Sequence, residues 1–321
     1  MSTKDIILKE MMESHGPVSG EKLAHKLGLT RNSVWKAIMQ LREEGYQIEA
    51  KNNFGYELKF SPDKLSVPGI LCWTKTSRIG RELEVHESVS STNVLGKKLA
   101  AQGVRHGYLI AAEAQTQGYG RFGRPFFSPG NAGIYISYVL RPQVPVDRAV
   151  MITSMAAVAV ARSIESLTDL EVKIKWVNDL YINDLKACGI SCEASMDFES
   201  TQLEYVVLGI GINVAKIDFP DELSSIATSL GNECDVPVSR NRLIAEISNH
   251  LEDLLPELSE GTFMNENRAR SNVIGRDVTV LNGEKSYTAH VLDIDDNGRL
   301  IIQTGEGITH VAAGEISLKL K

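Results

Sequence analysis

Apolar side chains near the start of the chain recur at helical spacing. Leu23 and Leu27 lie one turn apart, and a second series follows the i, i+4, i+7 pattern of a buried helix face at Val34, Ile38 and Leu41. A short stretch of glycine and polar residues separates the two series. We therefore predict two helices joined by a tight turn, which is the helix-turn-helix arrangement.

The turn and the outer face of the second helix carry residues suited to DNA. Gly28 is able to end the first helix in a left-handed conformation, and Thr30 is able to cap the second. Side chains of the types that contact DNA grooves and phosphates follow, and the predicted DNA contacts are Thr30, Arg31, Asn32, Ser33, Lys36 and Lys51. The competing interpretation is a small helical domain that binds protein.

Period-two alternation comes after the helices. Residues 46–50 and 56–60 alternate apolar and polar positions, as half-buried strands do, and the turn-rich stretch 51–55 between them carries Lys51. A helix-turn-helix followed by a hairpin is a winged helix. Proline-containing breaks at 61–63 and 67–69 then predict a linker.

The rest of the chain predicts a mixed α/β domain followed by a small β-barrel. Strand and helix patterns alternate through the middle, with predicted strands at 108–114, 132–141, 172–176 and 206–212, a hairpin at 180–190, and helices at 90–103 and 147–168. Four closely spaced strands separated by tight turns come last, at 277–281, 286–294, 299–303 and 308–312, and 314–316 is interpreted as an exposed tail. We expect an α+β multidomain protein with domains at residues 1–62, 66–270 and 271–321.

Charge and composition narrow the function classes. The net charge is −7, but residues 1–60 hold nine Lys and Arg against eight Asp and Glu, so DNA binding is expected only there and only weakly from one copy. No apolar run approaches the ~20 residues of a membrane span, and the N-terminus lacks a secretory signal, so we expect a soluble cytoplasmic protein. The four cysteines have no zinc-ligand spacing, so no metal site is predicted.

A glycine-rich loop is the most informative local feature. Residues 118–124 contain three glycines together with Arg121 and Arg124, but Pro125 follows and cannot open the helix that a dinucleotide site requires. Glycine amides and arginines together suit a phosphate or carboxylate that must be enclosed and later released. An ordinary mobile surface loop is the alternative.

Polar residues at the ends of predicted elements complete the candidate chemistry. Asn178 and Asp179 end a strand, where side chains reach a cleft, although an Asx-turn explains them equally well. Lys186 is the one cation in a mostly apolar stretch, and a solvent-facing lysine is its plain alternative. The cluster at 90–93 suits either helix capping or ligand binding.

Five of these motifs occur in one order. Ser91-Thr92-Asn93, Gln115-Thr116 with the 118–124 loop, Lys175-Trp176-Val177-Asn178-Asp179, Lys186-Ala187-Cys188-Gly189-Ile190 and Gly209-Ile210-Gly211-Ile212-Asn213 together resemble biotin–protein ligases. With the winged helix in front, the chain is similar to the bifunctional bacterial type, which is both ligase and biotin-operon repressor. The resemblance covers nearly the whole chain and implies a central ligase domain and a C-terminal Src-homology-like barrel.

The resemblance also implies a two-step reaction and a set of site residues. Biotin and Mg²⁺-ATP would give biotinyl-AMP, and a lysine of a biotin carboxyl carrier protein or domain would then take the biotinyl group. The implied catalytic residues are Lys186, Arg121 and Asp179. The implied biotin contacts are Ser91, Thr92, Asn93, Gln115, Tyr119, Gly120, Arg121 and Lys186, and the implied ATP or adenylate contacts are Gly118, Arg121, Arg124, Trp176, Asn178 and Asn213.

The repressor function would need operator DNA and two copies of the chain. With a net +1 on the N-terminal domain, tight binding requires a homodimer, which we expect biotinyl-AMP to promote. Three residues depart from the family pattern: Tyr119 stands where a cation is frequent, Phe126 or Phe127 where a tryptophan is common, and Val177 where proline is frequent. The rival interpretations are a lipoate–protein ligase and a regulator that senses a metabolite without catalysis.

Overall fold

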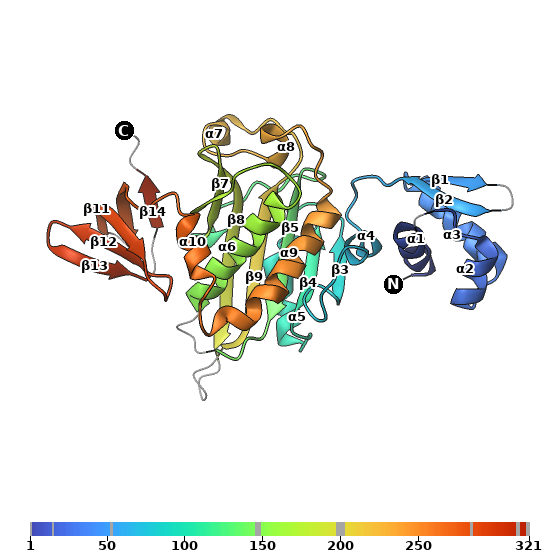
Figure 1. Cartoon of the computed structure of the whole chain (residues 1–321), viewed down its shortest axis with the longest axis horizontal. Helices are drawn as coiled ribbons and strands as arrows, with labels where there is room; N and C mark the ends of the chain where they lie inside the picture. The colour runs from blue at the N-terminus through green and yellow to red at the C-terminus, as the bar shows by residue number, and fades with distance from the viewer. Residues whose placement is uncertain are drawn as a thin grey trace.

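A computed structural model describes residues 2–14, 16–51, 54–144, 149–196, 203–282, 285–312 and 315–318. Three groups of elements follow one another along the long axis of the molecule, with a small helical unit at the N-terminal end, a sheet covered by helices in the middle and a small sheet at the C-terminal end (Figure 1). The chain is therefore a mixed α/β protein built from three parts.

The N-terminal part contains the predicted helix-turn-helix. Its elements are α1 Thr3–Glu13, α2 Gly20–Leu27, α3 Arg31–Glu43, β1 Gln47–Lys51 and β2 Gly55–Phe60. Gly28 ends α2 in the left-handed conformation at φ 63°, and the Thr30 hydroxyl accepts a hydrogen bond from the Ser33 amide at 3.1 Å. Helix α1 was not predicted, although its three buried residues, Ile7, Leu8 and Met11, are spaced as one face of a helix requires.

The prediction that residues 67–69 belong to a linker is wrong. Residues Val67–Leu71 form the short helix α4, and the Ser66 hydroxyl accepts a hydrogen bond from the Gly69 amide at 3.1 Å. Pro68 lies in the first turn, where an amide hydrogen has no helical partner in any case, so the proline is compatible with the helix. From the sequence, Pro68 is interpreted as a break in the chain's regular structure, but it lies in the first turn of α4, where a helix tolerates proline.

The central sheet has seven strands in the order β3-β4-β5-β9-β8-β7-β6. Only β3 and β4 pair in parallel, and the remaining neighbours are antiparallel. The strands are β3 Leu83–His86, β4 Tyr108–Ala112, β5 Gly133–Leu140, β6 Lys173–Lys175, β7 Asp179–Ile182, β8 Leu185–Met196 and β9 Leu203–Asn213. The helical segments are α5 Thr92–Ala101, η1 Arg121–Gly123, α6 Ala149–Glu165, α7 Asp221–Ser224, α8 Leu230–Glu233, α9 Arg240–Leu254, η3 Leu255–Leu258 and α10 Met264–Ala269.

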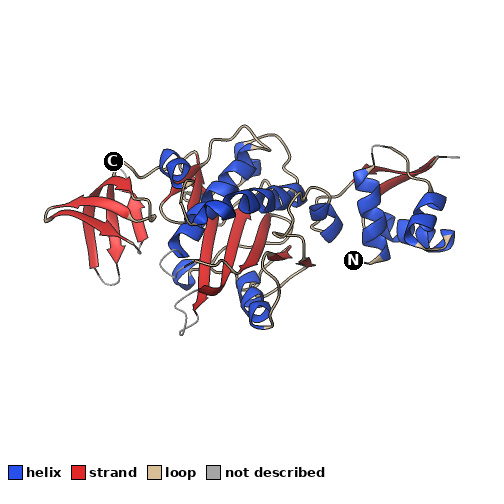
Figure 2. Cartoon of the chain, turned by 60° about the horizontal axis from the view of Figure 1, so that its bottom comes forward, coloured by secondary structure: helices blue, strands red, loops and turns tan. Residues whose placement is uncertain are grey.

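One face of this sheet is covered by two long helices and the other by one shorter helix. The long helices α6 and α9 lie side by side over one face, and α5 lies on the opposite face (Figure 2). Alternation along β5 shows the division, because the Tyr138 hydroxyl lies 2.8 Å from that of Ser248 in α9, whereas the Ser137 hydroxyl donates to Asn93 in α5 at 2.6 Å. The face that carries α5 is the one left open for a ligand.

The C-terminal part is a five-stranded antiparallel sheet in the order β13-β12-β11-β10-β14. Its strands are β10 Asp277–Asn282, β11 Lys285–Ile294, β12 Leu300–Thr304, β13 Gly307–Val311 and β14 Glu315–Leu318. The first four correspond to the predicted strands. The predicted exposed tail is wrong, because Ile316 is only 1% exposed and pairs with Val280 in the sheet; Gly314 lies outside the described residues.

Candidate active site

A cleft on the α5 face of the central sheet collects most of the predicted site residues. Its empty space is about 780 Å³, a volume that includes open solvent at the mouth. The predicted residues that line it are Ser91, Thr92, Asn93, Gln115, Tyr119, Gly120, Arg121, Arg124, Asn178, Asp179 and Lys186. Segments nearly a hundred residues apart in the chain thus meet in one place.

The start of α5 presents a hydroxyl to the cleft. Ser91 occupies the N-cap position, yet its side chain makes no capping hydrogen bond and is 3% exposed. Capping, the plain alternative for this cluster, therefore does not account for Ser91. The next residue is held from the loop side, because Gln115 Oε1 accepts a hydrogen bond from the Thr92 amide at 2.8 Å and another from Thr92 Oγ1 at 3.2 Å.

Asn93 faces the sheet and is fully engaged there. Its amide nitrogen donates to Ser191 Oγ at 2.9 Å and to Glu193 Oε1 at 2.8 Å, and its oxygen accepts from Ser137. These bonds fix the start of α5 against β5 and β8. Asn93 lines the cleft, but its polar atoms already have partners within the protein.

Glu193 is a residue of this site that sequence reasoning missed. One carboxylate oxygen accepts hydrogen bonds from Asn93 and from the Tyr119 hydroxyl at 3.0 Å, and the other accepts from Lys97 Nζ at 2.7 Å. Burial raises the pKa of Glu193, but the hydrogen bonds from Lys97, Asn93 and Tyr119 outweigh burial and leave the pKa below its usual value. No local pattern marks this carboxylate, because its partners come from distant segments.

The glycine-rich loop folds back on itself as a narrow hairpin. The Phe126 amide donates to Gly118 O at 2.9 Å, the Gly120 amide donates to Arg124 O at 2.9 Å, and the one-turn segment η1 lies at the tip. Gly118 does not line the cleft, and a side chain there would lie 2.6 Å from Ser128 Oγ, so close packing explains this glycine. The prediction that residues 124–129, which contain Pro125, open no helix is correct.

Two strand glycines make room for an aromatic ring beside the cleft. A Cβ at Gly211 would lie 2.6 Å from the Phe126 ring, and a Cβ at Gly189 would lie 3.3 Å from both Phe126 and Lys186 Nζ. Of Phe126 and Phe127, the first lines the cleft, together with Tyr119 and Phe122 of the loop, whereas Phe127 contacts Phe219. Between the two candidate positions, the cleft thus receives its aromatic wall from Phe126.

Cations and a carboxylate meet at one end of the cleft. Lys186 Nζ lies 2.7 Å from Asp179 Oδ1, and Arg121 donates to Asn178 Oδ1 at 3.3 Å. Asn178 is itself fixed, because its amide nitrogen donates to Ile190 O at 2.9 Å. This end can hold an anion between Lys186 and Arg121, with Asp179 beside it to accept a proton or to orient the lysine.

Besides Gly118, two more predicted nucleotide contacts, Trp176 and Asn213, lie outside the lining of the cleft. Trp176 is 5% exposed and donates through Nε1 to Gly298 O at 2.9 Å, which joins the central sheet to the C-terminal sheet. Asn213 is 7% exposed and donates to Thr228 O at 2.9 Å. Both side chains use their polar groups within the protein, so the structure brings neither into the cleft.

The predicted DNA contacts lie at the start of α3 and at the end of β1. Arg31, Asn32 and Lys36 are exposed, and Trp35 between them is 50% exposed although sequence reasoning did not single it out. Arg31 pairs with Glu21 at 2.6 Å and Lys51 with Glu57 at 2.5 Å. Thr30 and Ser33 are used in capping α3, which makes them supports of the helix as well as candidates for contact.

Known proteins resemble every part of the chain. The biotin/lipoate A/B protein ligase family matches residues 85–213, an HTH domain matches 4–57, and the biotin protein ligase C terminal domain matches 273–319. The bifunctional ligase/repressor BirA of Bacillus subtilis is 36% identical, with 98% of each chain covered, and BirA of Escherichia coli is 27% identical, with 94% and 92% covered. The structure of the Aquifex aeolicus biotin protein ligase in complex with biotin and ATP is similar at a TM-score of 0.65 and 26% identity, over 75% of this chain and 100% of that one.

Proposed function

The chain belongs to the family of bifunctional biotin–protein ligases and repressors, and from that membership we propose which residues perform its reaction and its regulation. As a member, it is an ATP-dependent biotin–protein ligase with an N-terminal helix-turn-helix repressor domain. The observation that carries the assignment of roles is the cleft in which Lys186, Asp179 and Arg121 lie together with Ser91, Thr92 and Gln115.

The first step joins two anions, and the cations of the cleft make that possible. A biotin carboxylate oxygen attacks the α-phosphorus of Mg²⁺-ATP, the bond from that phosphorus to the bridging oxygen breaks, and pyrophosphate leaves. Charge repulsion between carboxylate and phosphate is the barrier that Lys186 and Arg121 lower, because both already stand at one end of the cleft. The Mg²⁺ ion enters with ATP as part of the substrate.

The part of the cleft lined by Ser91, Thr92 and Gln115 suits the polar ring of biotin. Ser91 offers a hydroxyl that is not used for capping, and Thr92 and Gln115 provide further hydrogen-bonding groups beside it. Asn93 supports this end through Ser137, Ser191 and Glu193. Tyr119, Gly120 and Arg121 form the loop that closes over the ligand, and Gly118 supports the loop. On the nucleotide side we place Arg124 and Asn178 in contact, with Trp176 and Asn213 as supports behind them.

In the second step a carrier lysine must lose a proton before it attacks. With an ordinary pKa of ~10.4, its deprotonation at pH 7 costs roughly 4–5 kcal/mol. Asp179 is our candidate to accept that proton from the amine. Its carboxylate is paired with Lys186 when no ligand is bound, and an acyl phosphate that draws Lys186 away would leave it free to do so.

The N-terminal part is proposed to act as a winged helix on operator DNA. The antiparallel β1–β2 hairpin directly follows α3, which is where a wing stands, and Lys51 lies at the end of β1. The described C-terminal strands form an open series, and we propose that they curve into the small barrel of the family. The division at residues 1–62, 66–270 and 271–321 stays our proposal for the domain boundaries.

Exchange of pyrophosphate into ATP tests the ligase assignment. The purified chain should catalyse exchange with biotin and not with lipoate, and a variant carrying Lys186→Ala should lose at least about 100-fold in rate, because it lacks the central charge. Lys173→Ala removes a lysine of the edge strand β6 that pairs with Glu171 on the surface, and it should leave the rate unchanged. Exchange with lipoate, or with neither acid, would contradict the assignment, and undiminished exchange by the Lys186 variant would remove its proposed role.

A further inference from the structure

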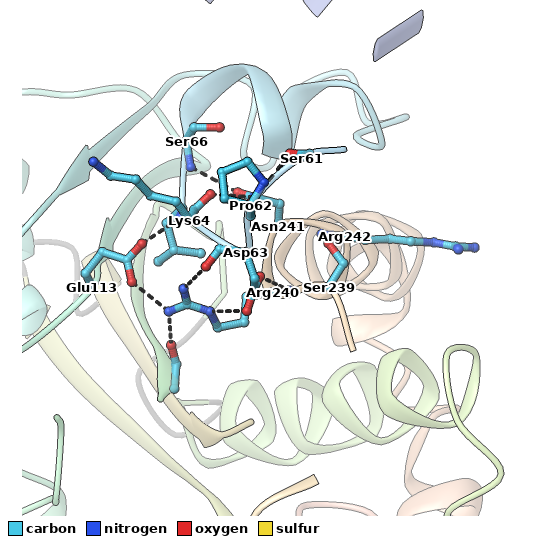
Figure 3. Close-up of polar contacts among 12 residues, drawn as sticks. Ser61, Pro62, Asp63, Lys64, Ser66, Glu113, Ser239, Arg240, Asn241 and Arg242 are labelled. Carbon is cyan, nitrogen blue, oxygen red and sulfur yellow. Dashed lines mark hydrogen bonds and ion pairs between the residues drawn. The ribbon is translucent and has the colours of Figure 1, made fainter. Parts of the chain in front are cut away.

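Arg240, at the start of α9, is fully buried and contacts the linker (Figure 3). Its Nε donates to Asp63 Oδ2 at 2.9 Å, and another guanidinium nitrogen donates to the Asp63 carbonyl oxygen. On its other side, the guanidinium donates to Glu113 Oε2 at 2.7 Å and to Gly133 O at 3.1 Å. One buried cation thus connects the linker to β5 and to the end of β4.

The residues around Arg240 hold the next three linker residues. Glu113 accepts a hydrogen bond from the Leu65 amide at 2.6 Å with its other oxygen. Asn241, which follows Arg240, donates to Lys64 O at 2.8 Å and accepts from the Ser66 amide at 3.0 Å. We call Asp63, Glu113, Arg240 and Asn241 the linker clamp. It binds the backbone of every residue from 63 to 66.

The clamp leaves almost no free chain between the two parts that it joins. Strand β2 ends at Phe60, so only Ser61 and Pro62 separate the hairpin from the first clamped residue, and the proline ring fixes one of their backbone angles. The apolar core of the N-terminal part is a cluster of its own that shares no member with the central core. Orientation of the N-terminal part therefore depends heavily on the polar clamp and on the contact between α1 and α4.

A buried charge cluster is a costly way to gain stability alone, because desolvation offsets much of its attraction. Such a cluster does fix geometry, because its hydrogen bonds form only when every partner is in position. Glu113 also stands two residues before Gln115, so the clamp is built on the strand that leads into the cleft.

We propose that the linker clamp fixes the direction of the DNA-binding part relative to the ligase sheet, so that two copies of the chain present their α3 helices at one set spacing. Asp63 and Arg240 are positioning residues for DNA binding and take no part in ligation. This inference rests on the proposed two-copy binding of operator DNA. If the N-terminal part were loosely tethered, ordering its orientation on DNA would cost much of the binding free energy. A clamped N-terminal part is already oriented and avoids that cost.

The central variant is Asp63→Ala, which removes the clamp carboxylate that is half exposed and leaves Glu113 to pair with Arg240. Asp63→Asn keeps an acceptor and should behave almost as the wild type. Glu87→Gln is the matched control, because Glu87 is 89% exposed and faces Lys64 of the same stretch at 3.7 Å without contacting the clamp.

Small-angle X-ray scattering of the full chain tests the fixed orientation directly. The wild type should fit the single arrangement of Figure 1, and Asp63→Ala should show a larger radius of gyration and a broadened distance distribution. Scattering of Asp63→Ala that matches the wild type would overturn the proposal. This measurement judges the clamp even if the chain neither ligates biotin nor binds DNA.

DNA binding tests the consequence. A duplex with two half-sites, selected from random DNA by the wild-type chain with biotin and ATP, and one half of that duplex are the two probes. Asp63→Ala should bind the full duplex at least about tenfold more weakly and the half duplex with unchanged affinity, while its pyrophosphate exchange stays at the wild-type rate. Equal losses on both duplexes, or a loss of exchange, would show that Asp63 does not act through spacing.

Discussion

At the scale of single residues, Tyr119 shows how this chain replaces a frequent family cation. Its hydroxyl bonds to Glu193, which Lys97 and Asn93 also hold, so the glycine-rich loop is attached to β8 through a neutral side chain. Tyr119 therefore bonds the loop to the Glu193 carboxylate, a partner to which a cation at this position could also bind.

We expect Tyr119→Phe to loosen the loop without altering the chemistry. Loss of this hydrogen bond should cost about 1 kcal/mol, so the KM for biotin should rise about fivefold and biotinyl-AMP should dissociate faster, with kcat for exchange little changed. Steady-state exchange and retention of radiolabelled adenylate on a filter would measure both effects. Tyr205→Phe, outside the cleft lining, is the control; equal effects of the two substitutions would refute a specific role of Tyr119.

Asp179→Asn separates the two steps of the reaction. The substituted amide keeps an oxygen beside Lys186, so adenylate formation should stay within a few-fold of the wild type. It cannot take a proton from the carrier lysine, so transfer should slow by about 100-fold. Single-turnover assays, first of adenylate formation and then of transfer to a carrier domain, resolve the two rates, and an unchanged transfer rate would remove Asp179 from this role.

At the scale of elements, the cleft depends on how closely α5 approaches the sheet. Gly209 of β9 makes the approach possible, because a Cβ there would lie 2.2 Å from Asn93 Oδ1 and 2.6 Å from Ser191 Oγ. The same strand accommodates the ring of Phe126 over Gly211. Two glycines in one strand thus receive two side chains of the protein itself, which together shape the cleft.

Gly209→Ala should push the start of α5 away from β9. Overpacking of this kind costs about 1–3 kcal/mol, and biotin binding should weaken because Ser91 and Thr92 move with the helix. Urea unfolding and biotin titration calorimetry are the measurements. Gly305→Ala, where an added Cβ meets nothing within 4 Å, is the control, and a Gly209 variant as stable as this control would disprove the close-packing argument.

At the scale of the whole molecule, charge limits how the chain can regulate. The net charge of −7 and the small positive balance of residues 1–60 make one copy a poor DNA ligand. None of the described helices is long and apolar enough to cross a membrane. We therefore expect that regulation by the N-terminal part needs two copies acting together.

Biotinyl-AMP should shift the chain from monomer toward homodimer. Sedimentation velocity at micromolar concentration, with biotin and ATP and with biotin alone, would measure the shift. The expected result is a heavier species that appears only when the adenylate forms. An adenylate-bound protein that sediments entirely as a monomer would contradict the proposed homodimer. It would also contradict the proposal that two copies present their α3 helices to DNA at a set spacing.

Local patterns were sufficient where local physics decides the structure. Gly28 and Thr30 fixed the ends of α2 and α3, because a left-handed cap and a side-chain cap each need only the neighbouring residues. Four C-terminal strands followed from alternation between tight turns. The same reasoning interpreted Pro68 as part of a linker and residues 314–316 as an exposed tail, although Pro68 lies in α4 and Glu315 and Ile316 pair in the edge strand β14. A short helix and an edge strand form because of the surfaces that they pack against, which local patterns do not contain.

The sequence by itself determined the order of the parts, most of the elements and the residue types that meet in the cleft, because periodicity, capping and motif order are properties of neighbouring residues. Only the tertiary structure decided that Glu193 holds Tyr119, that Phe126 rather than Phe127 lines the cleft, and that Arg240 binds a linker 177 residues away. These contacts join distant segments, and their energy comes from burial and mutual geometry that no stretch of sequence contains alone.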